Sequence, residues 1–497
     1  MHFSILRPLL ASAQKNPGKA AIIDRGSTVT YTQFLKDLNA FACWYQSLDD
    51  SSKQTVIMLP NGYPMALAIY GCAAANRVFV PVDYNMHFEN VCYILKNAEA
   101  NVLITDSKFA HLFENVHGLT VVNIDEAWTD DVLRSETIAS LDLKPEDPLA
   151  TIMYTTGTTG PQKGVMLSHA NLNQSARNIT EFMSIADDIV ESIPMPLSHS
   201  FGFGRLRVVL NAGGTAVLEQ GLLRPEIVLF NIQRLKVNAL SLVPTGFDFF
   251  QTRLSVFFDI IAPQLKYIEL GSAPMTAHHK SQLLSKCPNA VICMHYGLTE
   301  GSRSSFLNFS QDRDFLDSVG RPSPNCHIKI IPVNQDEEAT GCGRIAISGD
   351  HVAMGYWKMP DTTENAFVNG WLQTGDLGRF DENGYLYFIG REDDMINTHG
   401  LKVSPVEVEN VIKKMPNIDT CAVVGIPDTG ANNLDHTVKV FVTFGCKVTL
   451  GDIQVFCRKY MEPYKIPTVL EFIDRIPVTS SGKIQRTKLR LRTTPND

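Results

Sequence analysis

Between residues 154 and 164 the chain reads YTTGTTGPQKG, a segment that combines glycines, threonines and one lysine. Glycines let backbone N–H groups approach an anion closely, threonine hydroxyls donate hydrogen bonds, and lysine adds a positive charge. The segment therefore predicts a phosphate-binding loop, while an ordinary surface loop of the same composition is the competing interpretation. The residues that would contact phosphate are Thr155, Thr156, Gly157, Thr158, Thr159, Gly160 and Lys163.

This loop differs from the phosphate-binding loop (Walker A motif) of P-loop NTPases. In that loop a lysine directly follows the second glycine and precedes a serine or threonine. Here Pro161 and Gln162 separate Gly160 from the lysine, and Gly164 stands where the hydroxyl residue would be. The flanking residues predict a buried strand before the loop, and a strand end and a helix after it, with Ser168 as the N-cap.

The composition of the whole chain excludes several classes of protein. Its 497 residues amount to roughly three domain lengths, and a hydrophobic share of 44% allows a large buried core. The net charge of −8 argues against nucleic-acid binding, and no apolar run reaches the ~18–20 residues that a membrane span needs. Ten cysteines without a C-x-x-C pair are typical of reduced thiols in the cytoplasm. We interpret the N-terminal segment as an amphipathic helix, because a signal peptide has a longer apolar stretch.

The order of β-rich and helical segments predicts an α/β fold with layered, largely parallel sheets. We expect strands at 55–60, 77–84, 100–106, 119–125, 214–220 and 238–244, and helices at 30–48, 62–75 and 275–287. Between about 324 and 390, strands alternate with turns, which predicts a small antiparallel β unit. The sequence thus predicts a large N-terminal domain over 1–392, made of layered α/β subdomains and this unit, and a small C-terminal α/β domain over 393–497.

Five further segments, together with the loop, resemble one family in the order in which they occur. They are GSAPM (271–275), HYGLTE (295–300), WLQTGDLG (371–378), GREDDMINTHGLKVSPVEVE (390–409) and PVTSSGKIQR (477–486). These segments resemble the signatures of the adenylate-forming superfamily, which contains acyl- and aryl-CoA synthetases, adenylation domains of peptide synthetases, and luciferases. Because the motifs span nearly the whole chain in the right order, the resemblance covers both expected domains.

The resemblance implies a reaction in two steps. A carboxylate attacks the α-phosphate of ATP, with Mg²⁺ bound, and gives an acyl-adenylate and pyrophosphate; a second nucleophile then takes the acyl group. CoA is the favoured acceptor, and a carrier protein or an amine is the alternative. A protein that binds ATP as an inactive scaffold is a less favoured reading. The phosphate loop would hold the β- and γ-phosphates. The sequence leaves the oligomeric state of the protein open.

For the N-terminal domain the resemblance implies a nucleotide site built from four of the motifs. Glu300 would ligate magnesium, Thr299 would bind the α-phosphate, and Asp376 and Arg391 would bind the ribose. The adenine slot would consist of Gly271, Ser272, Ala273, Pro274, Tyr296 and Gly297. Without the motif context, each of these residues also suits a turn or a surface ion pair.

For the C-terminal domain the resemblance implies a mobile unit that carries the catalytic lysine. Lys483 would bridge the carboxylate and the α-phosphate, where charge develops in the transition state. Asp393 would be the hinge on which the domain swings between the two steps. Gly400 would border the channel for the thiol, and Lys402 would touch phosphate.

The stretch IPMPLSHSFGFGRLRVVLNAGGTAVL (193–218) should border the acid pocket. The resemblance places His199 beside the incoming carboxylate; a histidine packed in the core is the alternative. Ser200 is neutral, so no counter-charge is provided for the ammonium group of an α-amino acid. Six nearby apolar residues suit a hydrophobic or aromatic acid, although their pattern also fits the core; they are Phe201, Phe203, Val243, Phe247, Phe249 and Phe250.

One segment departs from the family pattern. Where the family often continues "GxPD" with a Gly-Glu pair, this chain reads GIPDTGANNLDHTVKV (425–440). The resemblance places this segment near the nucleotide part of CoA. The departure keeps transfer to a carrier protein or to an amine open.

Overall fold

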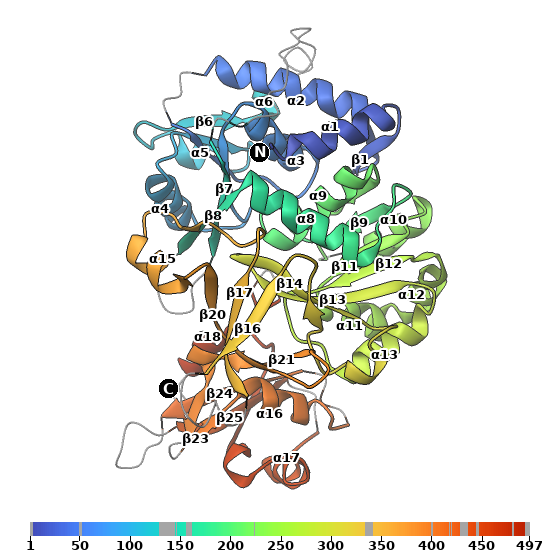
Figure 1. Cartoon of the computed structure of the whole chain (residues 1–497), viewed down its shortest axis with the longest axis vertical. Coiled ribbons are helices and arrows are strands. Elements are labelled where there is room, and N and C mark those ends of the chain that lie inside the picture. Colours follow the sequence, from blue (N-terminus) through green and yellow to red (C-terminus); the bar gives the residue numbers. More distant parts are fainter. Residues whose placement is uncertain are drawn as a thin grey trace.

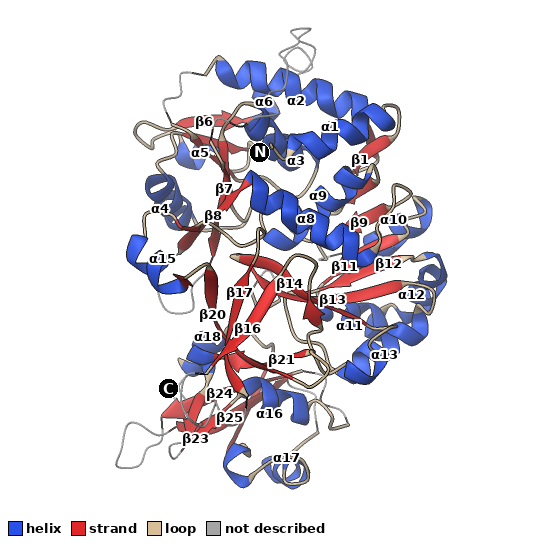
Figure 2. Ribbon diagram, in the orientation of Figure 1, coloured by secondary structure: helices blue, strands red, loops and turns tan. Residues whose placement is uncertain are grey.

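Strands and helices alternate along most of the chain, as the sequence predicts (Figures 1 and 2). The computed structural model describes residues 3–48, 52–128, 145, 147–155, 162–222, 224–332, 341–398, 401–416, 418, 420–427, 436–443, 447–479 and 482–492. Among the helices of these ranges, none is both long enough and apolar enough to cross a membrane.

One sheet has the strand order β18-β8-β7-β4-β3-β5-β6. Strands β3, β4 and β5 pair in parallel and are buried along their whole length, because helices cover both faces, whereas β7 and β8 pair antiparallel. Its strands are β3 (Gln54–Ile57), β4 (Val78–Pro81), β5 (Val102–Thr105), β6 (Thr120–Asn123), β7 (Leu149–Thr155), β8 (Lys163–Ser168) and β18 (Gly355–Tyr356). The helices between them are α3 (Tyr63–Ala74), α4 (Phe88–Ala98), α5 (Ala110–Phe113) and α6 (Ile124–Ala127).

The second sheet has the order β15-β14-β13-β12-β11-β9-β10-β1-β2, with parallel pairing from β13 to β1. Its strands are β1 (Ala20–Asp24), β2 (Ser27–Thr30), β9 (Val190–Ile193), β10 (Thr215–Leu218), β11 (Ala239–Leu242), β12 (Tyr267–Leu270), β13 (Val291–Leu298), β14 (Gly301–Asn308) and β15 (Arg321–Pro322). Its connecting helices are α10 (Pro225–Arg234), α11 (Pro244–Arg253), α12 (Ser255–Ile261) and α13 (Ala277–Lys286).

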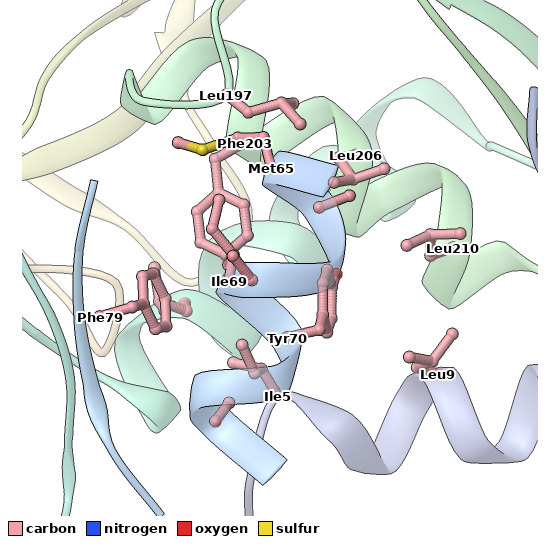
Figure 3. Packing of buried hydrophobic residues seen from close by; sticks show 14 of the residues in the cluster. Ile5, Leu9, Met65, Ile69, Tyr70, Phe79, Leu197, Phe203, Leu206 and Leu210 are labelled. Atoms are coloured by element: carbon pink, nitrogen blue, oxygen red, sulfur yellow. The ribbon is translucent and has the colours of Figure 1, made fainter. Parts of the chain in front are cut away.

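A shared hydrophobic core joins the two sheets. The helices that build it are α1 (Leu6–Lys15), α2 (Tyr31–Gln46), α3, α8 (His169–Met183) and α9 (Ser200–Ala212). Figure 3 shows Phe203 of α9 together with Phe79 of β4 and Tyr70 of α3. The Phe203 ring lies edge-on to both, with ring centres 5.5 Å from Phe79 and 6.3 Å from Tyr70. Buried aromatic rings contribute much of the energy of such a core. The first turn of α9 is therefore held firmly against both sheets.

A smaller antiparallel sheet follows, as the sequence predicts. It contains β16 (His327–Ile331), β17 (Cys342–Ser348), β19 (Phe367–Val368), β20 (Trp371–Phe380) and β21 (Leu386–Arg391), with α15 (Pro360–Ala366) beside it. The C-terminal part has a core of its own. Its elements are β22 (Ile396–Thr398), β23 (Leu401–Val403), α16 (Pro405–Ile412), β24 (Cys421–Pro427), β25 (His436–Thr443), α17 (Leu450–Cys457), β26 (Val469–Ile473) and α18 (Arg486–Arg490).

The expected fold class, α/β with a large first part and a small last part, is confirmed. The expected strands and helices are present, and Ser168 caps α8 by accepting a hydrogen bond from the backbone N–H of Asn171. Strand β26 and the β22–β23 hairpin were not expected. Both depend on pairing partners rather than on their own composition, since β26 is a third strand beside β25.

Candidate active site

The candidate site residues gather at one edge of the second sheet. Strands β9, β11, β12 and β13 are parallel neighbours, so their carboxyl ends meet at the same edge. The segments that follow these ends carry His199, Val243, Gly271 and Glu300. In open α/β sheets this edge is where ligands bind. The sheet order therefore brings together motifs that are about 100 residues apart in sequence.

The turn of the β13–β14 hairpin carries Thr299 and Glu300. Gly297 permits this turn, because a Cβ atom there would lie 2.5 Å from the backbone nitrogen of Arg303 across the hairpin. The backbone carbonyl of Glu300 accepts a hydrogen bond of 2.8 Å from Ala353, and its carboxylate accepts one of 2.8 Å from the Tyr356 hydroxyl. The Glu300 carboxylate is thus fixed at the tip of the hairpin.

Tyr356 is a site residue that the sequence reasoning missed. It lies in β18 and faces Val165 of β8, two residues after Lys163. The Lys163 ammonium lies 5.3 Å from the centre of the Tyr356 ring, and the hydroxyl of the same tyrosine bonds to Glu300. Tyr356 therefore links the lysine of the phosphate loop with the expected magnesium ligand. A tyrosine after a glycine gave no signal in the sequence, because its role follows from the β8–β18 pairing.

The phosphate loop itself is only partly described. Thr155 ends β7 and faces Lys163 at the start of β8, so the two strands form a hairpin that closes the loop. The residues between them that were expected to bind phosphate lie outside the described residues: Thr156, Gly157, Thr158, Thr159 and Gly160.

Asp376, Tyr296 and Arg391 come together although they belong to three separate motifs. The Tyr296 hydroxyl donates a hydrogen bond of 2.7 Å to Asp376 Oδ2, and Arg391 Nε lies 3.4 Å from Asp376 Oδ1. Asp376 and Arg391 face each other in the β20–β21 ladder. Burial, reinforced by the Asp376 charge, raises the pKa of Tyr296 well above its usual value, so this hydroxyl stays a donor.

The expected adenine segment follows β12 and lies over His295. A Cβ atom on Gly271 would lie 2.1 Å from the His295 ring, so only glycine allows this backbone to sit so close. Ser272 takes the left-handed conformation with φ +72°, and Ala273 and Pro274 complete the segment with partly or fully exposed side chains. A backbone surface is thereby presented beside Tyr296.

Lys483 reaches this site from the other end of the chain. A Cβ atom on its neighbour Gly482 would lie 3.7 Å from Thr245 and 3.8 Å from Val243, so the lysine loop packs at the carboxyl end of β11. The residue is exposed to solvent. Desolvation of its ammonium group and the nearby Arg391 lower its pKa, while Asp376 and Glu300 act in the opposite direction. Lys483 is therefore in the electrostatic field of the residues expected to bind the ribose and magnesium.

The structure adds no contact at the site for the two other C-terminal residues that were expected there, Gly400 and Lys402. Gly400 lies outside the described residues. Lys402 is exposed in β23, on a different element from the Lys483 loop. The roles of both residues remain predictions.

His199 precedes α9, and its Nε2 atom lies 3.7 Å from Oδ2 of Asp83, which follows β4. An apolar cluster of Met195, Phe201 and Val243, with Leu222 against it, lies beside this histidine and the Lys483 loop. Among the other aromatic residues expected at the pocket, the structure separates those in the core from the one at the surface. Phe203, Phe247 and Phe250 are fully buried in the larger cores, and Phe249 is 44% exposed.

A charge network lies under the apolar cluster, and the fully buried Glu269 of β12 is its centre. Arg205 Nη1 donates to Glu269 Oε2 at 2.8 Å, Arg303 Nε donates to Oε1 at 3.1 Å, and His295 Nδ1 lies 2.6 Å from Oε1. Arg205 also binds the buried Glu191 of β9 through two bonds. Burial alone would raise the pKa of Glu269, but Arg303, Arg205 and His295 hold it well below its usual value.

Comparison with known proteins agrees with this geometry. A model of the AMP-binding enzyme family matches residues 9–357, and a model of the AMP-binding enzyme C-terminal domain matches residues 407–483. The chain belongs to the AMP-binding enzymes. The resemblance to the adenylate-forming superfamily is confirmed, and with it the expectation of an enzyme rather than an inactive scaffold.

Relatives of this enzyme match it over nearly their whole length. The feruloyl-CoA synthase of Amycolatopsis sp is 28% identical over 489 residues, and the 2-succinylbenzoate–CoA ligase of Bacillus subtilis (strain 168) is 29% identical over 490 residues. Each alignment covers 97% of both chains. The structure of o-succinylbenzoate CoA synthetase from Bacillus subtilis with an acyl-adenylate intermediate is 26% identical, has a TM-score of 0.83 and covers 98% of both chains. The same protein has also been solved with ATP and a magnesium ion, at 27% identity and a TM-score of 0.82, over 97% of this chain and 98% of that one.

We expect Glu269→Gln to lower the free energy of unfolding by about 3–5 kcal/mol, because it leaves two buried guanidinium groups without their shared carboxylate. Urea unfolding of the purified protein measures this loss. Glu126→Gln is the matched control, because Glu126 is exposed in α6. Equal stability of the two variants would show that Glu269 does not hold this region together.

Proposed function

We propose that this enzyme activates a carboxylic acid with an apolar or aromatic body, forming an acyl-adenylate and pyrophosphate from ATP, and then transfers the acyl group to a thiol. CoA is the favoured thiol. The observation that carries the proposal is the packing of the Lys483 loop, from the C-terminal end of the chain, against Val243 and Thr245 at the carboxyl end of β11, with Asp376, Arg391 and Glu300 near the lysine. A lysine in that place can neutralise charge that develops between a carboxylate and an α-phosphate.

Glu300 is our proposed magnesium ligand. Its carboxylate offers a hard oxygen at the tip of the hairpin and is oriented by Tyr356. Among the described residues there is no cluster of three or more potential metal-binding side chains. A single carboxylate suits Mg²⁺, which usually keeps several waters and binds substrate phosphates as well. When bound, Mg²⁺ neutralises the charge of the phosphates that leave.

Asp376 is our proposed ribose acceptor, with Arg391 beside it. A carboxylate has about four lone-pair directions, and the Tyr296 hydroxyl occupies one of them. The remaining directions can accept hydrogen bonds from two ribose hydroxyls. The Tyr296 ring and the backbone of Gly271–Pro274 would then enclose the base, and Thr299 would lie next to the α-phosphate. The phosphate loop, with Thr155 and Lys163 at its two ends, would hold the leaving pyrophosphate.

The acid would lie between His199 and the apolar cluster of Met195, Phe201 and Val243. This cluster favours an apolar or aromatic body. Ser200 supplies no negative charge for an α-ammonium group, which disfavours amino acids. Below Phe201 the centre of the charge network is fully buried, so the cluster has a fixed polar floor. We infer that this floor favours a short or aromatic acid over a long chain directed through it.

The domain boundary at 392/393 is supported by ion pairs on either side of Asp393. Glu392 binds Arg344 of β17 in the N-terminal part through both carboxylate oxygens. Asp394 pairs with Arg486 and Arg490 in α18 of the C-terminal part. Asp393 is thus the one residue between an N-terminal and a C-terminal anchor. We propose that it is the hinge of the domain motion, and that the enzyme works in the cytoplasm.

Acid-dependent exchange of pyrophosphate into ATP tests the first step. The panel contains benzoate, a hydroxycinnamate, hexanoate and phenylalanine, and mass spectrometry follows the products with and without CoA. Exchange with benzoate or the hydroxycinnamate, and a CoA thioester when CoA is added, supports the proposal. An acyl-adenylate that CoA does not consume would favour a carrier protein or an amine as acceptor. Exchange with phenylalanine alone would overturn the proposed acid class.

Lys483→Ala should reduce acid-dependent exchange by about a hundred- to a thousandfold, because it removes the cation that stabilises developing charge. Transfer from a supplied acyl-adenylate should be nearly unchanged. Lys488→Ala, an exposed lysine in α18, is the matched control and should keep full exchange. A similar loss of both half-reactions in Lys483→Ala would show that the lysine does not act in the first step alone.

The pH dependence of exchange provides a second readout for Lys483. Its pKa is lowered from the usual 10.5, and the protonated form is the active one. Exchange should therefore fall, as pH rises, at a lower pH than a free lysine would give. The alkaline limb of the pH–rate profile should be missing from the residual activity of Lys483→Ala.

Tyr356→Phe should raise the magnesium concentration needed for half-maximal exchange by about tenfold or more, because it removes the hydroxyl that orients Glu300. The ring that lies near Lys163 is kept. Tyr385→Phe is the matched control, since it removes a tyrosine–carboxylate bond of 2.7 Å to Asp312, which lies outside the site. An unchanged magnesium requirement in Tyr356→Phe would separate this tyrosine from the metal site.

Asp393→Pro should impair transfer more than adenylation, because a fixed φ angle restricts the swing that the second step requires. Both half-reactions are measured on the same preparation. Glu382→Pro is the control for proline in a loop, because Glu382 is exposed and is the second residue of the turn closed by the bond from Gly384 N–H to the Asp381 carbonyl, a position that accepts proline. Equal rates of both steps relative to the unmodified enzyme would argue against a hinge at this residue.

A further inference from the structure

Arg303 holds the first turn of α9 by its backbone. Its Nη1 atom donates a hydrogen bond of 2.8 Å to the carbonyl oxygen of Ser200, and its Nη2 atom donates one of 3.0 Å to the carbonyl oxygen of Phe201. The same side chain donates through Nε to Glu269 at 3.1 Å. It is fully buried, so these bonds act in surroundings of low polarity and are not weakened by water. One guanidinium group therefore connects β12, β14 and α9.

A glycine makes room for this guanidinium group. A Cβ atom on Gly204 of α9 would lie 2.4 Å from Arg303 Nη1 and 2.9 Å from Cζ. Any larger residue at position 204 would therefore push the guanidinium away from the two carbonyl groups. Glycine in a helix interior is less favourable than alanine, so the position has a helix-weakening residue where close contact requires one. Arg303 and Gly204 fit each other as a pair.

The residues that Arg303 holds belong to the proposed acid site. His199 directly precedes the first turn of α9, which Arg303 holds, and Phe201 is part of the apolar cluster beside it. The guanidinium carbon lies 5.1 Å from the centre of the Phe201 ring, and the ring lies edge-on to His295 at 4.9 Å. Backbone and ring of Phe201 are thus both positioned by the network. The nucleotide residues Asp376 and Arg391 lie on another sheet and receive no bond from Arg303 among the described residues.

We propose that Arg303, seated in the space left by Gly204, is a positioning residue for the acid and sets the place of the acid-binding turn of α9 independently of the nucleotide site. The proposal rests on the proposed function, because it concerns the same acid site. It predicts a split in kinetic constants. Disturbing Arg303 should weaken the use of the acid while leaving the use of ATP unchanged, whereas a residue that only stabilises the fold should change neither constant.

Arg303→Lys and Arg205→Lys provide matched variants. Both keep a positive charge next to Glu269, but a lysine cannot reach two carbonyl oxygens and a carboxylate with one planar group. Arg205 contacts Glu191 and Glu269 and donates to neither Ser200 nor Phe201. We expect Arg303→Lys to raise the KM for the acid with the highest exchange rate in the panel by about tenfold or more, with the KM for ATP within about twofold. Arg205 lies on α9 itself, so Arg205→Lys should lower the midpoint of thermal unfolding. It should raise the KM for the acid clearly less than Arg303→Lys does, because Arg303 still holds the carbonyl groups of the first turn.

Gly204→Ala tests the same inference without changing any charge, and it serves if Arg303→Lys does not fold. Alanine is the better helix former, so this variant would be more stable if the space at position 204 were free. We expect instead a lower unfolding midpoint and a higher KM for the acid. Gly451→Ala in α17 is the control, because a Cβ atom there meets nothing closer than 3.7 Å. This variant should be as stable as the unmodified protein or more stable, with unchanged kinetics.

The outcomes separate the two proposals. Acid-dependent exchange in the unmodified enzyme, combined with an unchanged KM for the acid in Arg303→Lys and Gly204→Ala, would overturn the positioning role alone. An equal rise of the KM values for the acid and ATP would overturn it as well, since it would indicate a general disturbance. No acid-dependent exchange in the unmodified enzyme with any acid would overturn both proposals.

Discussion

The carboxylate of Glu269 is the constraint on which the rest of the site depends. It lies in the middle of the second sheet without contact with water, and such a charge is tolerated only when opposite charges surround it. Arg205 connects it to β9, His295 lies against it from β13, and Arg303 approaches from β14. These strands and α9 carry the turn proposed for the acid, the segment proposed for adenine and the hairpin proposed for magnesium. One buried charge thus fixes the relative positions of elements with different tasks.

The nucleotide half of the site is built in another way, from contacts that remain partly open. Tyr296, Asp376 and Arg391 meet where the hairpin of the large sheet faces the small antiparallel sheet. Lys483 adds a charge from the C-terminal part, and the residue stays accessible to solvent. A rigid buried floor under the proposed acid site and an accessible nucleotide side suit the proposed reaction. In that reaction ATP must enter, react and leave as pyrophosphate and AMP.

Local sequence predicted the elements of this enzyme well and their contacts poorly. Buried strands such as β3 and β5 are runs of β-branched and aliphatic residues, and the motif residues could be placed on loops from the sequence alone. Tyr356 and Arg303 could not be identified, because each acts through a partner more than 50 residues away. The phenylalanines could not be sorted either, since core and pocket residues have the same composition. Only the packing of α9 and α11 separates Phe201 from Phe203 and Phe247.

The fit between Gly204 and Arg303 has a consequence for how this enzyme can change over generations. The two positions lie about 100 residues apart, yet a replacement at either one disturbs the contact that the other makes. A larger residue at 204 displaces the guanidinium, and a smaller residue at 303 leaves a void and removes the donor to the Ser200 and Phe201 carbonyl groups. Substitution at either position alone is therefore disfavoured. A new acid specificity that depends on the buried charge network requires substitutions at both positions. Descendants of this chain should inherit the two residues together or lose them together.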